Sequence, residues 1–143
     1  MKKKVITIIS GTMLLTIAAG SIYGKSVSSH TESEPDVVGT FSMNRDENLT
    51  VVANREQIED KVAFARELLQ MYKDNSFYST KFSTDRGYAT SLDMNIYLWK
   101  EDIEDGASVM TAEYRPVEYG KDYDVVNNPD KFELYIDGKE VKE

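Results

Sequence analysis

The chain has 143 residues, no cysteine, and 17 basic against 25 acidic side chains, which gives a net charge of −8 at pH 7. Beyond its first four residues it lacks the clustered lysines and arginines that displace counterions from phosphate backbones, so we expect no nucleic-acid partner. The absence of cysteine excludes disulfides, thiol nucleophiles, thiolate metal sites and a lipidated-cysteine anchor. The length predicts one domain with a modest core.

Residues 1–24 are predicted to be a signal peptide or an N-terminal transmembrane anchor. Lys2 to Lys4 supply a positive start, residues 5–19 an apolar stretch, and residues 18–20 the small side chains that a signal peptidase accepts. In the alternative, residues 5–23 stay uncleaved and span the bilayer, as the chain's only contact with a membrane. Both alternatives predict an extracytoplasmic protein, secreted or anchored to the cell membrane by residues 5–23, and we expect a source of the Gram-positive bacterial type.

Residues 25–36, KSVSSHTESEPD, are predicted to be a flexible polar tether, because they are rich in serine and acid and contain little apolar surface. They include His30, the only histidine of the chain. A histidine in a tether lacks the fixed position that a general base or a metal ligand needs. Residues 37–143 are then expected to form a single α+β domain.

This domain is expected to begin with two short β-prone runs, 37–41 and 49–53, followed by a long amphipathic helix at 54–74. Asn54 is a suitable N-cap, and Gln57 three residues later completes the pattern of a capping box. Apolar residues recur every three or four positions and form a stripe wide enough to cover a sheet. They are Ile58, Val62, Phe64, Ala65, Leu68, Leu69, Met71 and Tyr72.

The clearest period of two lies in residues 88–99, YATSLDMNIYLW, which predicts a half-buried central strand. Its apolar face consists of Tyr88, Leu92, Met94, Ile96 and Leu98. A weaker alternation in 77–84 and a turn at 85–87 predict a strand that pairs antiparallel with it. Further strands are expected at 108–114 and 131–137. This order predicts an α+β fold in which one amphipathic helix packs on a four- to five-stranded antiparallel sheet.

Two acidic loops are candidate cation sites, because hard cations bind several carboxylate oxygens. One loop holds Glu101, Asp102, Glu104 and Asp105, and the other holds Asp122, Asp124 and Asp130. The spacing in the first loop does not match an EF-hand loop, and the acids of the second could converge, but we predict no metal site and no cofactor. No G-x-S-x-G element or glycine-rich phosphate loop is present, and the mid-strand acid, Asp93, lies on a polar face where a solvated aspartate is ordinary. The sequence therefore favours a protein without catalytic activity.

The polar face of the central strand is the candidate contact site. Asp93, Asn95, Tyr97 and Trp99 alternate with the apolar row, and aromatic side chains on a polar sheet face supply large contact area at a low entropic cost. In the alternative, the loop 115–129 covers this face and makes a second small core, or the sheet curls upon itself. We expect a non-catalytic binding module whose partner is an unknown protein or envelope component. The alternatives are a cell-envelope hydrolase or metal-dependent enzyme that uses the loop carboxylates, and a structural component of the envelope.

Overall fold

The structure is a computed structural model that describes residues 30–142, in which a compact unit begins at Glu32. The predicted signal peptide or anchor at 1–24 lies outside the described residues. Within residues 30–142, no helix is long and apolar enough to cross a bilayer.

Residues 32–36, which the sequence places in the tether, are bonded to the segment that follows the second strand. The Ser33 N–H donates to the Asn54 carbonyl at 3.0 Å, and the Glu32 carboxylate accepts from the Glu56 N–H at 2.9 Å. Asp36 is already the first residue of a strand. The packed part of the chain therefore includes the last residues of the predicted tether.

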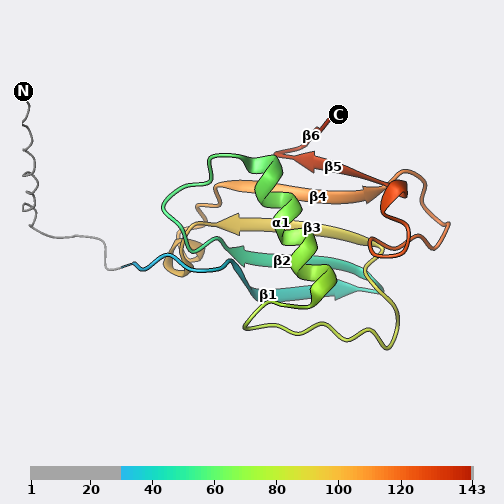
Figure 1. The fold of residues 1–143 in the computed structure, drawn as a ribbon, viewed down its shortest axis with the longest axis horizontal. Coiled ribbons are helices and arrows are strands. Elements are labelled where there is room, and N and C mark those ends of the chain that lie inside the picture. Colours follow the sequence, from blue (N-terminus) through green and yellow to red (C-terminus); the bar gives the residue numbers. More distant parts are fainter. Residues whose placement is uncertain (1–29, 143) are drawn as a thin grey trace, which may run out of the picture. The chain divides into compact units, whose positions relative to one another are not determined.

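A sheet of six strands organises the unit, with the order β1-β2-β3-β4-β5-β6 across the sheet (Figure 1). The strands are β1 (Asp36–Met43), β2 (Asp46–Val52), β3 (Ser91–Tyr97), β4 (Met110–Pro116), β5 (Phe132–Ile136) and β6 (Lys139–Glu140). The single α-helix of residues 30–142, α1 (Lys61–Asp74), crosses one face of the sheet diagonally, and two 3-10 turns, η3 (Lys100–Ile103) and η4 (Pro129–Lys131), follow β3 and precede β5. The α+β class is confirmed. The predicted sheet is corrected in two respects, because it has six strands rather than four or five and is mixed rather than antiparallel.

The mixed character of the sheet comes from β2 and β3, which pair in parallel with Val51 opposite Ile96. Strand, helix and strand form a crossover: α1 and the segment 75–90 return the chain to the end of the sheet where β2 began. A strand that starts again from that end must run in the same direction as its predecessor. The other neighbouring strands are antiparallel.

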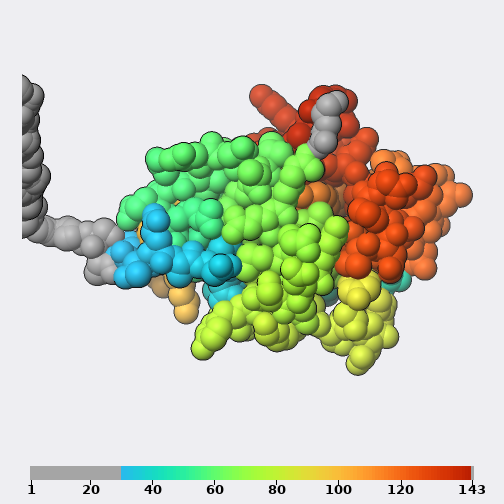
Figure 2. Space-filling model, viewed as in Figure 1, coloured from blue at the N-terminus to red at the C-terminus, as the bar shows by residue number. Residues whose placement is uncertain are grey.

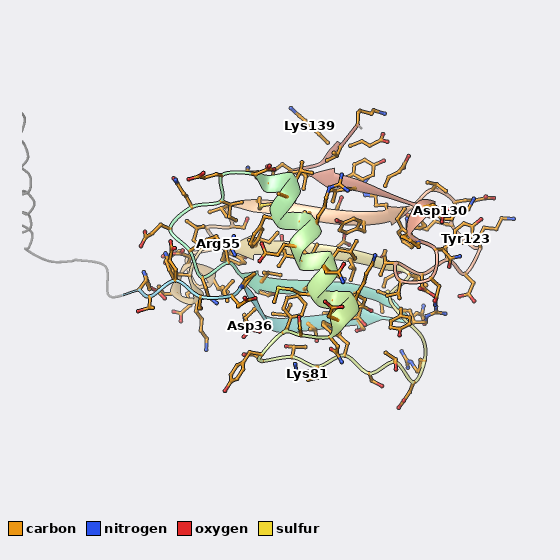
Figure 3. All side chains as sticks on the ribbon, in the orientation of Figure 1. Asp36, Arg55, Lys81, Tyr123, Asp130 and Lys139 are labelled. Carbon is orange, nitrogen blue, oxygen red and sulfur yellow. The ribbon has the colours of Figure 1, made fainter. Side chains whose placement is uncertain are left out.

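The predicted strand at 77–84 is wrong, and so is its antiparallel pairing with the central strand. This segment forms no strand and is fixed to β1 by side chains: the Thr80 hydroxyl donates to the Val37 carbonyl at 2.6 Å, and the Asp36 carboxylate accepts from Ser79. Figure 3 shows Asp36 on β1 and Lys81 on the neighbouring segment. The alternation was weak, and the side chain that enters the core is Phe77.

The predicted start of the helix is also corrected. The N-cap is Asp60, whose carboxylate accepts from the Ala63 N–H at 3.0 Å, and the helix begins at Lys61. Asn54 instead takes a left-handed backbone conformation with φ 59° and donates from its side chain to the Glu34 carbonyl. The end at Asp74 is as predicted, and Asn75 closes the helix in the left-handed conformation that C-caps favour.

The core lies between α1 and the sheet. The predicted apolar row is confirmed at Leu92, Met94 and Ile96 of β3, which are at most 2% exposed. They face the buried residues of the helix, which are Phe64, Ala65, Leu68, Met71 and Tyr72. Because side chains of a strand alternate between its two faces, the intervening residues of β3 point to the side away from α1.

Candidate functional site

The sheet face away from α1 is polar in its centre, and we call it the open face. Strand register places its exposed and half-buried side chains on all six strands. They are Phe41, Met43, Asp46, Asn48, Thr50, Ser91, Asp93, Asn95, Tyr97, Thr111, Glu113, Arg115, Glu133, Tyr135 and Glu140. No α-helix of residues 30–142 covers this face (Figure 1).

Three of the four predicted contact residues lie together on the open face. Asn95 is exposed, and Asp93 and Tyr97 on either side of it are half-buried. Trp99 does not join them in the strand, because β3 ends at Tyr97 and the chain turns into η3, where Trp99 is only 9% exposed. The Trp99 N–H donates to the Asp102 carboxylate at 3.2 Å, which fixes this turn.

Residues 115 and 116 of the predicted loop 115–129 belong to β4, and the rest of this alternative cover reaches the helix side at Val125. Val125 is buried in the core cluster together with residues of α1, and its N–H donates to the Ala89 carbonyl at 3.0 Å. Tyr119 of the same loop is 73% exposed. The loop therefore contributes to the main core through Val125.

Asp93 has an acidic neighbour that sequence reasoning did not identify. Antiparallel register places Glu113 of β4 directly opposite Asp93 of β3. Partial burial and the neighbouring Glu113 carboxyl group raise the pKa of Asp93, and Arg115 opposes the rise. Like charges directly opposite across two strands also destabilise the folded state.

A short chain of polar contacts extends from this pair across β4 and β5. The Arg115 guanidinium forms an ion pair with Glu113 and lies over the Tyr135 ring, 3.9 Å from its centroid. The Tyr135 hydroxyl donates to Glu133 at 3.5 Å. Arg115 thus neutralises the charge of Glu113 and stacks on the Tyr135 ring. The charge of Asp93, at the end of this series of contacts, is less well neutralised.

Asp46 places a third carboxylate on the β2 side of the pair. It accepts hydrogen bonds from the Thr90 hydroxyl at 2.7 Å and the Ser91 hydroxyl at 3.0 Å. Its negative charge contributes to the raised pKa of Asp93. The centre of the open face is therefore an acidic strip that crosses β2, β3 and β4.

Sequence reasoning missed Glu113, Arg115, Tyr135 and Asp46. The strands at 108–114 and 131–137 were predicted, and their alternation places Glu113 and Tyr135 on the polar side. Which residue of β4 faces Asp93 depends on the register between strands, and the composition of β4 does not specify that register.

The acidic loops have structural roles instead. Asp102 caps η3, Asp122 pairs with Arg45 at 2.8 Å, and the buried Asp124 accepts from the N–H groups of Val126 and Asn127 in its own turn. Figure 3 shows Asp130 close to Tyr123, at the end of the unit that carries the second acidic loop. Within the described residues 30–142, no group of three or more histidine, cysteine or acidic side chains is placed to hold a metal ion.

Comparisons with protein-family models, with curated proteins and with solved structures found no match for this chain. A function is therefore assigned from the geometry of the chain's own residues.

Proposed function

We propose that this protein is an exported, non-catalytic binding module of a bacterial cell envelope, and that its open face binds a basic surface of a partner protein. The export part of the proposal rests on the lysine-first apolar leader in residues 1–24. The binding part rests on one observation, the Asp93–Glu113 carboxyl pair in the centre of an uncovered sheet face.

The charge of the open face favours a cationic partner. On the open face the strands carry five carboxylates, from Asp46, Asp93, Glu113, Glu133 and Glu140. Two cations oppose them, namely Arg115 on β4 and Lys142, which pairs with Glu140 at 3.0 Å. An acidic face raises the local concentration of positively charged partners and orients them during encounter. A lysine or arginine placed against Asp93 would also relieve the repulsion between the two acids and form charge-assisted hydrogen bonds.

Apolar side chains beside the acids supply contact area. Tyr97 and Tyr135 flank the acid pair on β3 and β5, and on β1 the side chains of Phe41 and Met43 are 61% and 62% exposed. Aromatic and methionine side chains are enriched at protein interfaces, where charged residues complement them at the periphery. A partner segment that combines basic and apolar side chains matches this arrangement.

The test is affinity capture from the envelope fraction of the producing cell, with Asn95→Arg as the surface variant. Asn95 is exposed in the middle of the open face, so the substitution adds bulk and positive charge without disturbing the core. Gln57→Arg is the matched control, because Gln57 is exposed in the loop before α1. We expect the wild type and Gln57→Arg to retain a partner that Asn95→Arg loses, and retention to weaken as salt rises. A partner retained equally by all three proteins would contradict the proposed surface.

A hydrolase that uses Asp93 and Glu113 is the second candidate. Two neighbouring carboxyl groups, with the pKa of one raised, are an arrangement that general acid–base hydrolysis can use. Within the described residues, neither Asp93 nor Glu113 lines the grooves that border α1, and a reacting substrate needs an enclosing cleft to orient it. Hydrolysis of cell-wall glycans by the wild type, lost in both Asp93→Asn and Glu113→Gln, would establish the hydrolase in place of the binding module.

A further inference from the structure

A groove of about 500 Å³ lies on the opposite side of the sheet, between α1 and the segment 125–134. A helix of 14 residues is about 21 Å long and about 10 Å wide, whereas six strands span about 24 Å. α1 starts beside the turn between β5 and β6, where Lys61 pairs with Asp137 at 2.8 Å, and crosses toward β1. It therefore leaves one corner above β4 and β5 uncovered. Figure 2 shows the helix side of the unit, with α1 in green beside the orange-red segment.

The floor of the groove is apolar. Tyr114 of β4 and Leu134 of β5 are buried at its base, each 7% exposed. Leu69 of α1, Phe132 of β5 and Val141 near the end of the chain line it while they remain only partly buried. Three incompletely buried apolar side chains from three separate segments thus converge on one cavity, whose size is in the range of small-molecule sites.

The charged side chains at the rim are positive. Arg66 and Lys73 border the groove from α1. The Glu133 carboxylate, although its residue borders the groove, lies on the open face, where it accepts from the Tyr135 hydroxyl. Burial raises the pKa of Tyr114 at the base to about 12, and the positive charge of Arg66 opposes this rise. Two cations at an apolar groove are notable in a chain with 25 acids and 17 bases.

We propose that this groove binds an anionic amphiphile, namely a medium-chain aliphatic carboxylate. The aliphatic chain lies on Leu69, Phe132 and Val141, and the carboxylate lies at the rim beside Arg66 and Lys73. The apolar floor complements the aliphatic tail of this ligand, and the cationic rim complements its negatively charged head group. The site is independent of the open face, because it lies on the other side of the sheet and uses different residues.

The test is a titration of the folded protein with decanoate below its micelle concentration, followed by backbone amide NMR. We expect saturable shifts centred on Leu69, Phe132 and Val141. Acetate supplies the head without the tail, and decyltrimethylammonium supplies the tail with the opposite charge; both are expected to bind at least tenfold more weakly than decanoate. Equal binding of the two decyl probes, or decanoate shifts spread over the surface, would overturn the proposal.

Variants separate the rim from the floor. The double substitution Arg66→Gln and Lys73→Gln is expected to weaken decanoate binding at least tenfold, whereas Lys100→Gln in η3 leaves it unchanged. Val141→Trp fills the groove and is expected to abolish binding. Unchanged affinity in the double variant or in Val141→Trp would refute the site.

Shifts of the same amides with protein concentration alone would assign the groove to a second copy of the chain and overturn the carboxylate proposal. If a variant does not fold, the relative affinity of the wild type for decanoate and decyltrimethylammonium decides whether the groove prefers a negative head group.

Discussion

Asp93 and Glu113 lie directly opposite each other on β3 and β4, so two acids occupy the centre of the open face. The pKa of Asp93 is raised in the folded state, so the folded protein binds more protons than the unfolded chain between the two pKa values. The contribution of Asp93 to stability is therefore greatest below its unfolded pKa of about 3.9 and falls as pH rises through the folded pKa. At neutral pH the ionised pair costs stability, and a cationic group of the proposed partner would offset that cost.

Asp93→Asn is therefore expected to stabilise the protein at pH 7. The gain should be about 0.2 to 1 kcal/mol, the usual range for pairs directly opposite across two strands, and it should shrink as pH falls below the folded pKa of Asp93. Urea unfolding at pH 7 and pH 4 measures both values. Asp130→Asn, at an exposed acid of η4, is the control and should change little at either pH. A loss of stability in Asp93→Asn at pH 7 would mean that attraction to Arg115 outweighs the repulsion.

Tyr114 should make the stability of the protein depend on pH in the alkaline range. Its pKa is raised to about 12 by burial, whereas an unfolded tyrosine ionises near 10. The unfolded state therefore loses its proton first, and the free energy of unfolding should fall between pH 10 and pH 12 by up to about 1.4 kcal/mol per pH unit from this group. Tyr114→Phe should make that fall less steep in urea melts, although Tyr72, whose pKa is also raised, still contributes. Tyr119→Phe, at an exposed tyrosine, should keep the wild-type slope.

The cap of α1 provides a test of where the helix starts. Asp60→Ala removes the carboxylate that accepts from the Ala63 N–H and should cost about 1 kcal/mol of unfolding free energy. Gln57→Ala is the control, because Gln57 precedes the helix and its side-chain contact is the exposed one to Glu59. Equal losses in the two variants would place the start of the helix nearer to residue 54.

The two faces of β3 should differ sharply in their tolerance to truncation. Ile96→Ala removes a fully buried side chain from the core and should cost about 2 to 5 kcal/mol. Its chain neighbour Asn95 is exposed on the open face, so Asn95→Ala should stay within about 0.5 kcal/mol of wild type. Similar thermal unfolding of the two variants would contradict the assignment of the faces.

The period of two was sufficient to predict which side chains of β3 are buried. Side chains of a strand alternate between its two faces, and this rule needs no contact with another segment. The sequence alone therefore predicts the burial of Leu92, Met94 and Ile96 and places Asp93 and Asn95 on the opposite face. Trp99 departs from that prediction because the strand ends two residues earlier, at Tyr97, and the Asp102 cap turns the chain.

The remaining features depend on contacts between distant segments. Asn54 and Asp60 are both good N-caps by residue type, and the bond from Asn54 to the Glu34 carbonyl favours Asp60 as the actual cap. The parallel pairing of β2 and β3, and the register that brings Glu113 to Asp93, arise only when the crossover is packed. Pattern reasoning along the chain therefore predicts the strand that carries Asp93 and misses the acid beside it.

The central claim is that the open face contacts a partner, and site-specific photo-cross-linking in the producing cell tests it most directly. A benzoylphenylalanine side chain placed at Asn95, and in a second protein at Gln57 as the control, reports what lies within reach of each position. We expect a discrete adduct with one protein from position 95 and none from position 57. We also expect that Asp93→Asn combined with Glu113→Gln removes the adduct. No adduct at position 95, or the same adducts from both positions, would contradict the open face as the binding surface.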